Sequence, residues 1–406
     1  MLVNYVKNNV YFLAPRHFSL EFSNKNEEVE ISETLMTYLS NAKNEIEEHI
    51  TDWDVYKKYI NTYEYIHTPV WREKNPVAQL NPVSRSFYKF IEIINYFNIL
   101  DAYKNTKLKT FHLAEGPGGF IEAIQYMRNS NTIKDVTIND EYWGLTLLEN
   151  KYGVPNWNKL QAKIKKYGLS NINFFLGKDE RGDLYDVENF TECVKNHKNS
   201  CDIMTGDGGF DFSLNFADQE KVAVKLLLVQ SLYAIMMQKK GGTFIIKFFD
   251  MFTYASMELL YLLKSFYKTV IVTKPKTSRY ANSERYIVCR DFMMNSTLIF
   301  EPVFKQMIKN IKDSDMNLVR ILNVDIPYHF KLNLEQSNIL LGKQQLATIN
   351  NTNQLIQAPK NDKITKFVKN NREKCVRWCI DNNIPYNKIK NENIFLKKTI
   401  QNNTKQ

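Results

Sequence analysis

The stretch FHLAEGPGGF at residues 111–120 decides the fold prediction, because it joins an apolar strand pattern to a glycine-rich turn. A strand is predicted at Thr110–Ala114, and a helix is expected to begin near Ile121. Glycines allow the backbone of the turn to contact a ligand, and the helix that follows offers free amide donors. A tight turn without a ligand is the alternative, but such a turn rarely needs three glycines for its geometry alone. The spacing differs from G-x-G-x-x-G, which argues against a nicotinamide enzyme.

Outward from this turn, residues 71–300 alternate helical stretches with short apolar runs rich in β-branched and aromatic residues. This alternation is typical of a parallel sheet flanked by helices, so the predicted fold class is α/β. A long helix is predicted from about Asp218 to Lys239, with Gly241 and Gly242 as its end signal and a strand directly after them. The predicted strands are Thr110–Ala114, Glu141–Leu147, Asn173–Leu176, Asp202–Thr205, Thr243–Phe249, Thr269–Thr273 and Glu284–Arg290.

The two regions that flank this central domain have a different composition. Residues 1–70 are predicted to form a helical extension, because Ile31 to His49 has apolar residues at helical spacing and no glycine. Residues 301–406 contain almost no glycine and are predicted to form a basic, mainly helical module. Its last part, Lys360 to Gln406, holds 12 Lys or Arg against 4 Asp or Glu. Such a segment attracts RNA through counterion release, although a solvated helix face explains the charge equally well.

Composition excludes several classes of protein. With 406 residues, 44% of them apolar, and a net charge of +10, the chain can fold around one large or two moderate cores. Its apolar runs are too short to cross a bilayer, and its start lacks the pattern of a secretory signal, so we expect an intracellular, cytoplasmic protein. The five cysteines form an odd number, which fits a reducing compartment. Cys375 and Cys379 could share one helix face, but no second pair completes a zinc site, and no metal is predicted.

Charged residues lie beside the predicted strands in three segments besides the glycine-rich turn. Asp207 lies in an acidic, glycine-rich turn after an apolar strand, and Lys247 sits within a strand too apolar for an unpaired cation. Glu284 opens another strand, and Lys89 lies in an amphipathic helix. Each of the four could form an ordinary salt bridge or face water. If they converge beside the turn, their charges shift one another's pKa, which is typical of a catalytic site.

These motifs resemble those of the FtsJ-like RNA 2′-O-methyltransferases, specifically the branch that contains the metazoan and viral cap methyltransferases. The resemblance spans about Asn81 to Phe292. Lys89 lies in SRSFYK (84–89), which is similar to the family's S-R-[AS]-x-x-K, and HLAEGPGGF (112–120) is similar to H-L-x-E-x-P-G-x-F. Asp207 matches the aspartate after the fourth strand, and Lys247 matches the lysine of G-G-x-x-x-x-K. Glu284 matches the glutamate of S-R-x-x-N-S-E-x-Y, so the family's K-D-K-E set occurs in order.

The resemblance implies a Rossmann-like, seven-stranded methyltransferase sheet and a site for S-adenosylmethionine at the glycine-rich turn. The residues implied for this site are Glu115, Gly116, Pro117, Gly118, Gly119, Phe120, Thr146 and Asp207. The chain departs from the family pattern at His112, where bacterial members carry an aspartate, and near Thr146, where the usual acidic residue after the second strand is not obvious. Asp179 is the candidate for contact with the adenine.

The same resemblance implies 2′-O-methylation of ribose in RNA, at the first or second transcribed nucleotide of capped mRNA. Lys247 would approach the 2′-hydroxyl with its pKa lowered by the nearby Lys89, while Asp207 and Glu284 orient both amines. Glu115 and the flanking regions favour the cap branch over a ribosomal or transfer RNA methyltransferase. A non-catalytic RNA-binding subunit that keeps the fold is a further alternative. The family branch and the Asn-rich, Lys-rich composition fit a large cytoplasmic virus.

Overall fold

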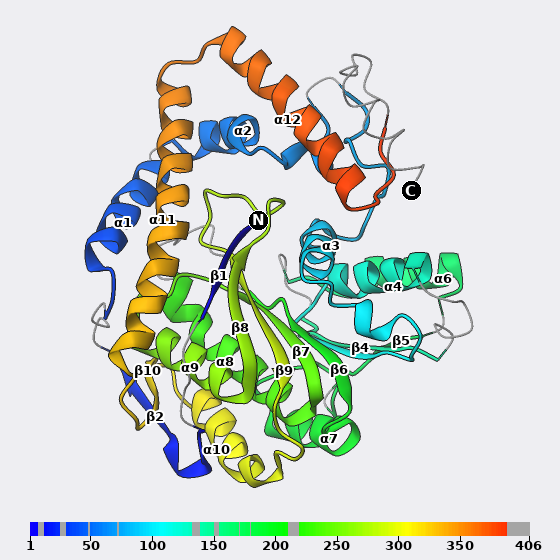
Figure 1. The fold of residues 1–406 in the computed structure, drawn as a ribbon, viewed down its shortest axis with the longest axis vertical. Coiled ribbons are helices and arrows are strands. Elements are labelled where there is room, and N and C mark those ends of the chain that lie inside the picture. The colour runs from blue at the N-terminus through cyan, green and yellow to red at the C-terminus, as the bar shows by residue number, and fades with distance from the viewer. Residues whose placement is uncertain are drawn as a thin grey trace.

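An eight-stranded sheet forms the centre of the computed structural model, in the order β1-β8-β9-β7-β6-β3-β4-β5 (Figure 1). The structure describes residues 1–6, 12–24, 30–47, 49–70, 73–131, 139–149, 154–169, 171–178, 180–209 and 219–387. The strands from β5 to β7 are parallel, whereas β9 is antiparallel to both β7 and β8. The strands are β1 (Leu2–Tyr5), β3 (Lys109–Leu113), β4 (Glu141–Leu145), β5 (Ile172–Phe174), β6 (Cys201–Gly206), β7 (Gln238–Phe248), β8 (Tyr267–Lys274) and β9 (Arg285–Phe292). All seven predicted strands are present, and the α/β prediction is confirmed.

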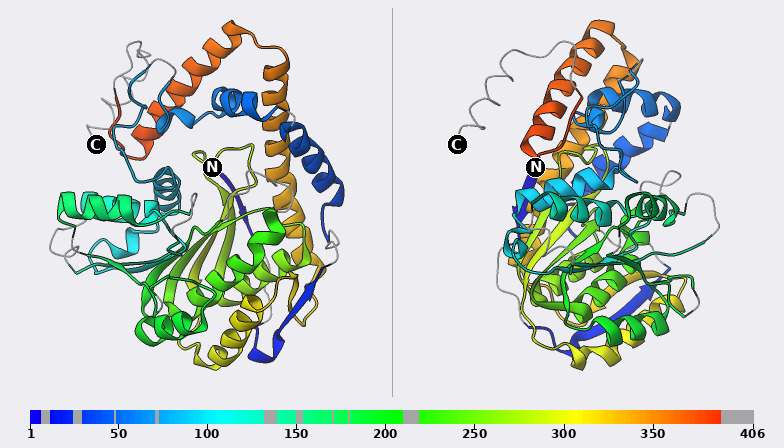
Figure 2. Two further views of the ribbon diagram at one scale, coloured as in Figure 1. Left: turned by 180° about the vertical axis from the view of Figure 1, so that it is seen from behind. Right: turned by 90° about the vertical axis from the view of Figure 1, so that its right-hand side faces the viewer.

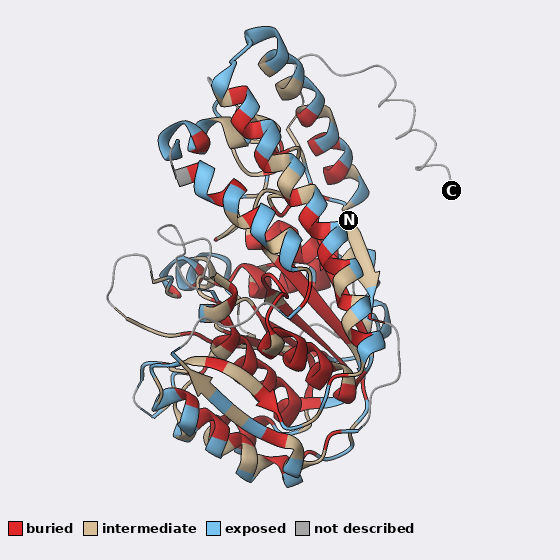
Figure 3. Ribbon diagram, turned by 90° about the vertical axis from the view of Figure 1, so that its left-hand side faces the viewer, coloured by how far each residue is buried: buried red, intermediate tan, exposed pale blue. Residues whose placement is uncertain are grey.

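Helices cover both faces of this sheet, because its strands alternate apolar side chains between two cores. In β7, Phe244 and Ile246 pack into one core, whereas Ile245 between them packs into the other. Figure 3 shows that the buried residues gather in the strands and on the helix sides that face them. The helices of one layer are α3 (Ser86–Tyr96), α4 (Gly119–Asn131) and α6 (Asn158–Tyr167), and those of the other are α7 (Val187–His197), α8 (Gln219–Met237) and α9 (Tyr254–Phe266).

The boundary between α8 and β7 differs from the prediction. The helix ends at Met237, and β7 begins directly at Gln238, so Gly241 and Gly242 lie inside the strand. Gly241 has φ +78°, and the pairing of β7 with β6 shifts register between Cys201 and Ile203. The glycine therefore marks an irregularity in a strand and does not end the helix.

The first 70 residues contain strands as well as helices. The predicted helix over Ile31 to His49 is confirmed as α1 (Glu33–Glu47), and α2 (Ile50–Ile60) follows it. However, β1 joins the central sheet beside β8, and β2 (Phe18–Ser23) pairs with β10 (Asn317–Leu322) in a separate two-stranded sheet. Both pairings bridge more than 250 residues of sequence, which a local sequence pattern does not reveal.

The helices after the central domain frame one end of the sheet. Figures 1 and 2 show α11 running beside the sheet, with α12 leading back across to α3. Helices α1 and α2 pack against α11. These C-terminal helices are α10 (Glu301–Lys312), α11 (Tyr328–Gln357) and α12 (Asn361–Asp381), and the short 3-10 helices are η1 (Pro15–His17), η2 (Glu64–Ile66), η3 (Asp101–Tyr103) and η4 (Leu298–Phe300). Residues 388–406 of the basic tail lie outside the described residues.

Within the described ranges, no helix has the length and apolar character that a membrane span requires. All five cysteines are free and buried, Cys375 and Cys379 on α12 included. The same part of the chain contains no group of three or more His, Cys, Asp or Glu side chains placed to hold a metal ion.

Candidate active site

Four charged side chains from three strands and one helix meet at one edge of the sheet. Asp207 directly follows β6, and Lys247 lies near the end of β7. Because β9 runs antiparallel to β7, its first residues lie at the same edge, and Tyr286 is paired with Lys247. Glu284 immediately precedes β9, and Lys89 reaches this edge from α3. The sequence segments that carry the four residues are therefore brought together.

Lys89 and Glu284 form a closely bonded pair. The Lys89 Nζ lies 2.7 Å from Glu284 Oε1 and 2.8 Å from Oε2. Ser278 Oγ donates a further hydrogen bond to Oε1 at 2.7 Å. Burial would raise the pKa of Glu284, but the positive charges of Lys89 and Lys247 outweigh it and hold that pKa well below its usual range. Burial lowers the pKa of Lys89, and the charge of Glu284 opposes this shift.

Lys247 and Asp207 form a looser pair. The Lys247 Nζ donates to the backbone oxygen of Asp207 at 2.6 Å and lies 3.5 Å from its carboxylate Oδ1. The Tyr286 hydroxyl donates to the same Oδ1 at 3.3 Å. A Cβ added at Gly209 would lie 2.9 Å from Lys247 Nζ, so the glycine leaves room for the ammonium. The two pairs also act on each other, because Asp207 raises the pKa of Lys89 and Lys247 lowers that of Glu284.

The glycine-rich turn is packed tightly against its own chain. A Cβ at Gly118, which has φ +103°, would lie 2.4 Å from Leu160 Cδ2, and one at Gly119 would lie 2.1 Å from Ser86 Oγ. These two glycines are therefore required by the packing of the turn between α3 and α6. The turn contains a cis peptide bond before Pro117, and Phe120 stacks on Phe90 with ring centroids 4.2 Å apart.

Glu115 is the buried acidic residue of this turn. Its Oε1 accepts the backbone N–H of Phe120 at 2.7 Å, whereas its Oε2 has no hydrogen-bond partner among the described residues. Burial raises the pKa of Glu115 well above its usual value, and the negative charge of Asp207 adds to this shift. An unpaired carboxylate oxygen in a buried turn indicates a place where a polar ligand atom could bind.

The other residues predicted for the cofactor differ in where they lie. Thr146 accepts the backbone N–H of Gly116 at 3.2 Å through Oγ1, so it adjoins the turn. Asp179 lies outside the described residues. His112 lies within the sheet, where its ring nitrogens bond to Thr110 and Thr205, and burial lowers its pKa to about 3. The ring therefore links β3 to β6 as a neutral group.

Three polar residues of the site were not predicted from the sequence. Tyr286 and Ser278 contact Asp207 and Glu284, and both belong to the SRYANSERY motif, which could have revealed them. Lys274, at the end of β8, donates to the backbone oxygens of Asn282 and Glu284 and is fully buried. Burial lowers the pKa of Lys274 to about 7. No sequence pattern distinguishes this lysine from a solvated one.

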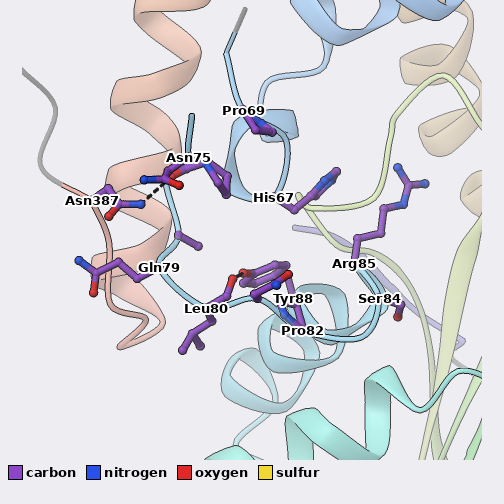
Figure 4. A pocket seen from close by; sticks show the side chains of 13 residues that line it. His67, Pro69, Asn75, Gln79, Leu80, Pro82, Ser84, Arg85, Tyr88 and Asn387 are labelled. Atoms are coloured by element: carbon purple, nitrogen blue, oxygen red, sulfur yellow. Dashed lines mark hydrogen bonds between the residues drawn. The ribbon is translucent and has the colours of Figure 1, made fainter. Parts of the chain in front are cut away.

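A pocket of about 700 Å³ opens beside the start of α3 (Figure 4). His67, Arg85, Tyr88 and Asn387 are among its lining residues. Arg85 forms no ion pair with a carboxylate of the described residues, although it is partly buried. Burial lowers the pKa of Arg85, and the positive charge of Arg279 adds to the shift, whereas the charges of Glu284 and Glu64 oppose it. An arginine in such surroundings suits a bound anion.

Comparisons with known proteins agree with this architecture. The model of the FtsJ-like methyltransferase family matches residues 82–292, from just before α3 to the end of β9. The cap-specific mRNA (nucleoside-2′-O-)-methyltransferase 2 of Danio rerio is 27% identical over 290 residues, which cover 69% of this chain and 38% of that protein. The cap-specific mRNA (nucleoside-2′-O-)-methyltransferase 1 of Trypanosoma brucei brucei is 29% identical over 224 residues, which cover 53% and 56%.

A further relative carries a different description. The protein named inactive cap-specific mRNA (nucleoside-2′-O-)-methyltransferase 1B of Caenorhabditis briggsae is 27% identical, over 66% of this chain and 31% of its own. The present chain thus spans less than two thirds of the length of each of these relatives. The matched segment nevertheless makes up more than half of the chain and contains all four converging charges, and the chain belongs to the FtsJ-like methyltransferase family.

Proposed function

We propose that this chain methylates the ribose 2′-oxygen of RNA, at the first or second transcribed nucleotide of capped mRNA, with S-adenosylmethionine as the methyl donor. The observation that carries the proposal is the convergence of Lys89, Asp207, Lys247 and Glu284 beside the glycine-rich turn. Two amines and two carboxylates in one network can hold a hydroxyl group and manage its proton. Because an active and an inactive relative have similar identities, sequence identity does not decide between them, and this geometry supports the active alternative.

The residues at the turn fit S-adenosylmethionine. The unpartnered Glu115 Oε2 provides a buried acceptor for a polar group of a ligand. The backbone of Gly116 to Phe120, together with Thr146 and Asp207, would hold the cofactor. When bound, S-adenosylmethionine supplies a methyl group on a positively charged sulfur, which is already electrophilic.

Lys247 is the residue that we assign to the 2′-hydroxyl. Its ammonium has three N–H donors, one of which bonds to the Asp207 backbone oxygen, while the Asp207 carboxylate lies 3.5 Å away. Donors of Lys247 therefore stay available to a substrate oxygen. In contrast, Lys89 bonds to both oxygens of Glu284 and serves to balance the charge of the site. Lys247 would orient the hydroxyl in line with the methyl group. As an ammonium it would stabilise the negative charge that develops on the 2′-oxygen, and as a neutral amine it would accept the hydroxyl proton.

The pocket at Arg85 supports an RNA substrate. It borders α3 at the helix start, four residues before Lys89, and a phosphate could pair with the arginine. Capped mRNA as the substrate is supported by the activity for which the similar proteins of Danio rerio and Trypanosoma brucei brucei are named, and by the matched family.

Methyl transfer to synthetic RNAs tests the proposal. We expect incorporation into capped RNA whose first two nucleotides carry free 2′-hydroxyls, and much less into the same RNA without a cap. RNA with 2′-deoxy nucleotides at both positions is the matched control and should accept no methyl group. Equal incorporation into capped and uncapped RNA would contradict the cap assignment, and incorporation into the deoxy control would contradict ribose as the acceptor.

A further inference from the structure

Glu92 is a buried carboxylate on α3, one helical turn after Lys89. Its oxygens accept hydrogen bonds from two other parts of the chain. The backbone N–H groups of Lys276 and Thr277 donate to it at 2.7 and 3.1 Å, and Thr277 Oγ1 donates at 3.0 Å. The indole Nε1 of Trp378 on α12 donates at 3.2 Å. The carboxylate thus joins three elements that are distant in sequence.

Two of these elements carry the two members of the Lys89–Glu284 pair. Helix α3 holds Lys89 as well as Glu92, and the loop between β8 and β9 holds Thr277 as well as Glu284. The Lys89–Glu284 pair and the bonds from Glu92 to Thr277 therefore link the same helix to the same loop at two points. Other bonds hold the loop to the rest of the fold, among them those from Arg279 to Glu64 and from Lys274 to the backbone of Asn282 and Glu284. The bonds to Glu92 are its second attachment to α3, and two attachments to one helix restrict how the loop can turn against that helix. Glu92 is thus placed to set the direction from which Glu284 meets Lys89.

Helix α12 supports this junction from outside the matched methyltransferase segment. Trp378 is buried, and its ring lies edge-on to Tyr88 of α3 with centroids 5.9 Å apart. Asn382, directly after α12, accepts a hydrogen bond from Asn95 at 3.0 Å. In Figure 1 the end of α12 comes down onto α3. The end of α12 and the residue after it therefore contact α3 both before and after Glu92 in the sequence. The indole N–H of Trp378 is one more hydrogen-bond donor to the Glu92 carboxylate.

We infer that Glu92 and Trp378 are positioning residues for methyl transfer: Glu92 holds the Glu284 loop against α3, and α12 holds Glu92 through the Trp378 indole. This inference rests on the proposed function for its catalytic consequence, but the junction itself can be measured without any activity. It gives α12 a part in the active site, although α12 lies outside residues 82–292. Neither side chain contacts the reacting atoms.

Two conservative substitutions test the junction. Glu92→Gln keeps the side-chain length but turns an N–H₂ group toward some of the four donors, which breaks part of the bonding. Trp378→Phe removes only the indole N–H and keeps an aromatic ring against Tyr88. We expect kcat to fall about 10- to 100-fold in Glu92→Gln and several-fold less in Trp378→Phe, because a small misplacement of reacting groups is costly. The KM for RNA and the Kd for S-adenosylmethionine should stay within about twofold.

The matched controls are Glu258→Gln and Trp53→Phe. Glu258 is also a buried carboxylate that accepts two backbone N–H groups, those of Ile321 and Leu322, but it lies on α9 away from the site. Trp53 is a buried tryptophan of α2. Both controls should leave kcat unchanged even where they lower the melting temperature. A drop of kcat in Glu258→Gln equal to that in Glu92→Gln would show a general stability effect and overturn the inference.

Amide hydrogen exchange of the loop at residues 275–284 separates this inference from the proposed function. We expect faster exchange of this loop in Glu92→Gln and Trp378→Phe, and no further increase when the two substitutions are combined, because both act on one junction. Unchanged loop exchange, or faster exchange with unchanged kcat, would overturn the positioning role. A wild-type protein that methylates no RNA would instead refute the proposed function, and the exchange data would still decide whether the junction holds the loop.

Discussion

The two halves of the candidate active site hold their lysines in different ways. In the first half, Lys89 lies 2.7 and 2.8 Å from the two oxygens of Glu284, and Ser278 adds a third donor to that carboxylate. In the second half, the carboxylate of Asp207 stays 3.5 Å from Lys247. The first half lies on helix α3 and on the loop between β8 and β9, which Glu92 also holds. The second half lies at the ends of β6 and β7, beside Gly209. This difference fits the roles that we propose for the two lysines, in which Lys89 balances the charge of the site and Lys247 meets the substrate.

The largest effect that tests this comparison is expected from Lys247→Ala. If Lys247 meets the 2′-hydroxyl, its loss should lower kcat by about 100- to 10,000-fold, because a group that acts in proton transfer is removed. Calorimetry should show S-adenosylmethionine binding close to that of the wild type. Lys247→Arg refines the test, because arginine keeps the charge but does not deprotonate. Wild-type turnover in Lys247→Ala would end the assignment, and retained activity in Lys247→Arg would argue for charge stabilisation without base catalysis.

The second test compares the stability of the two halves. Glu284→Gln should lower the free energy of unfolding by about 3–5 kcal/mol, because it leaves the buried Lys89 without its partner. Asp207→Asn should cost about 1 kcal/mol, because the looser pair contributes less and Asn keeps an acceptor for Tyr286. Urea unfolding of both variants at pH 7 measures the difference. Equal losses of unfolding free energy in the two variants would mean that both ion pairs contribute equally to stability, contrary to what their N–O distances indicate.

The third test reduces the space around the open lysine. Gly209→Ala would place a methyl group against Lys247 Nζ, and the flexible end of the lysine would have to shift. We expect kcat to fall by up to about 10-fold, with little change in melting temperature. Gly168→Ala is the control, because Gly168 has φ +64° but no atom within 4 Å of an added Cβ. The control should lower stability by about 1 kcal/mol and leave kcat unchanged, and the reverse pattern would contradict a need for room at Gly209.

The last test concerns Lys274, which lies at the end of β8 and bonds to the backbone oxygen of Glu284. Its pKa is lowered to about 7, so between pH 7 and 10.5 the folded protein binds fewer protons at this residue than the unfolded chain does. The free energy of unfolding therefore rises with pH in that window, by at most about 1.4 kcal/mol per pH unit from this group. The stability of the wild type relative to Lys274→Met should accordingly grow between pH 7.5 and 9.5 in thermal unfolding. A difference that is flat across this range would show that Lys274 stays charged in the fold.

The sequence allowed the prediction of the central sheet, because each parallel strand is a compact apolar run with a turn signal beside it. Lys247 was selected because a lysine inside an apolar strand is conspicuous, and Asp207 because it lies in a glycine-rich turn after a strand. Lys89 and Glu284 were selected through the resemblance to the family's motifs. The Glu92–Trp378 contact could not be predicted, since it joins residues 286 positions apart without any local pattern. The packing of Gly118 against Leu160 was not predicted, because it depends on a helix about 40 residues away, and the expected contact of this glycine with a ligand stays a prediction.

The four-residue strand β1 has a consequence for how the chain reaches its final shape. It pairs with β8 from Leu2↔Lys274 to Tyr5↔Ile271, and Asn4 Nδ2 also bonds to Ser337 of α11. Residues 2–5 therefore cannot take their place in the sheet until residues 271–274, some 270 positions later in the chain, have been synthesised. From the time β8 forms until β1 pairs with it, the flank of β8 exposes unpaired amides and carbonyls that can pair with another molecule. Because β1 and β8 lie far apart in the sequence, their pairing is a slow kind of contact to form, and association through the open edge of β8 is expected before β1 docks.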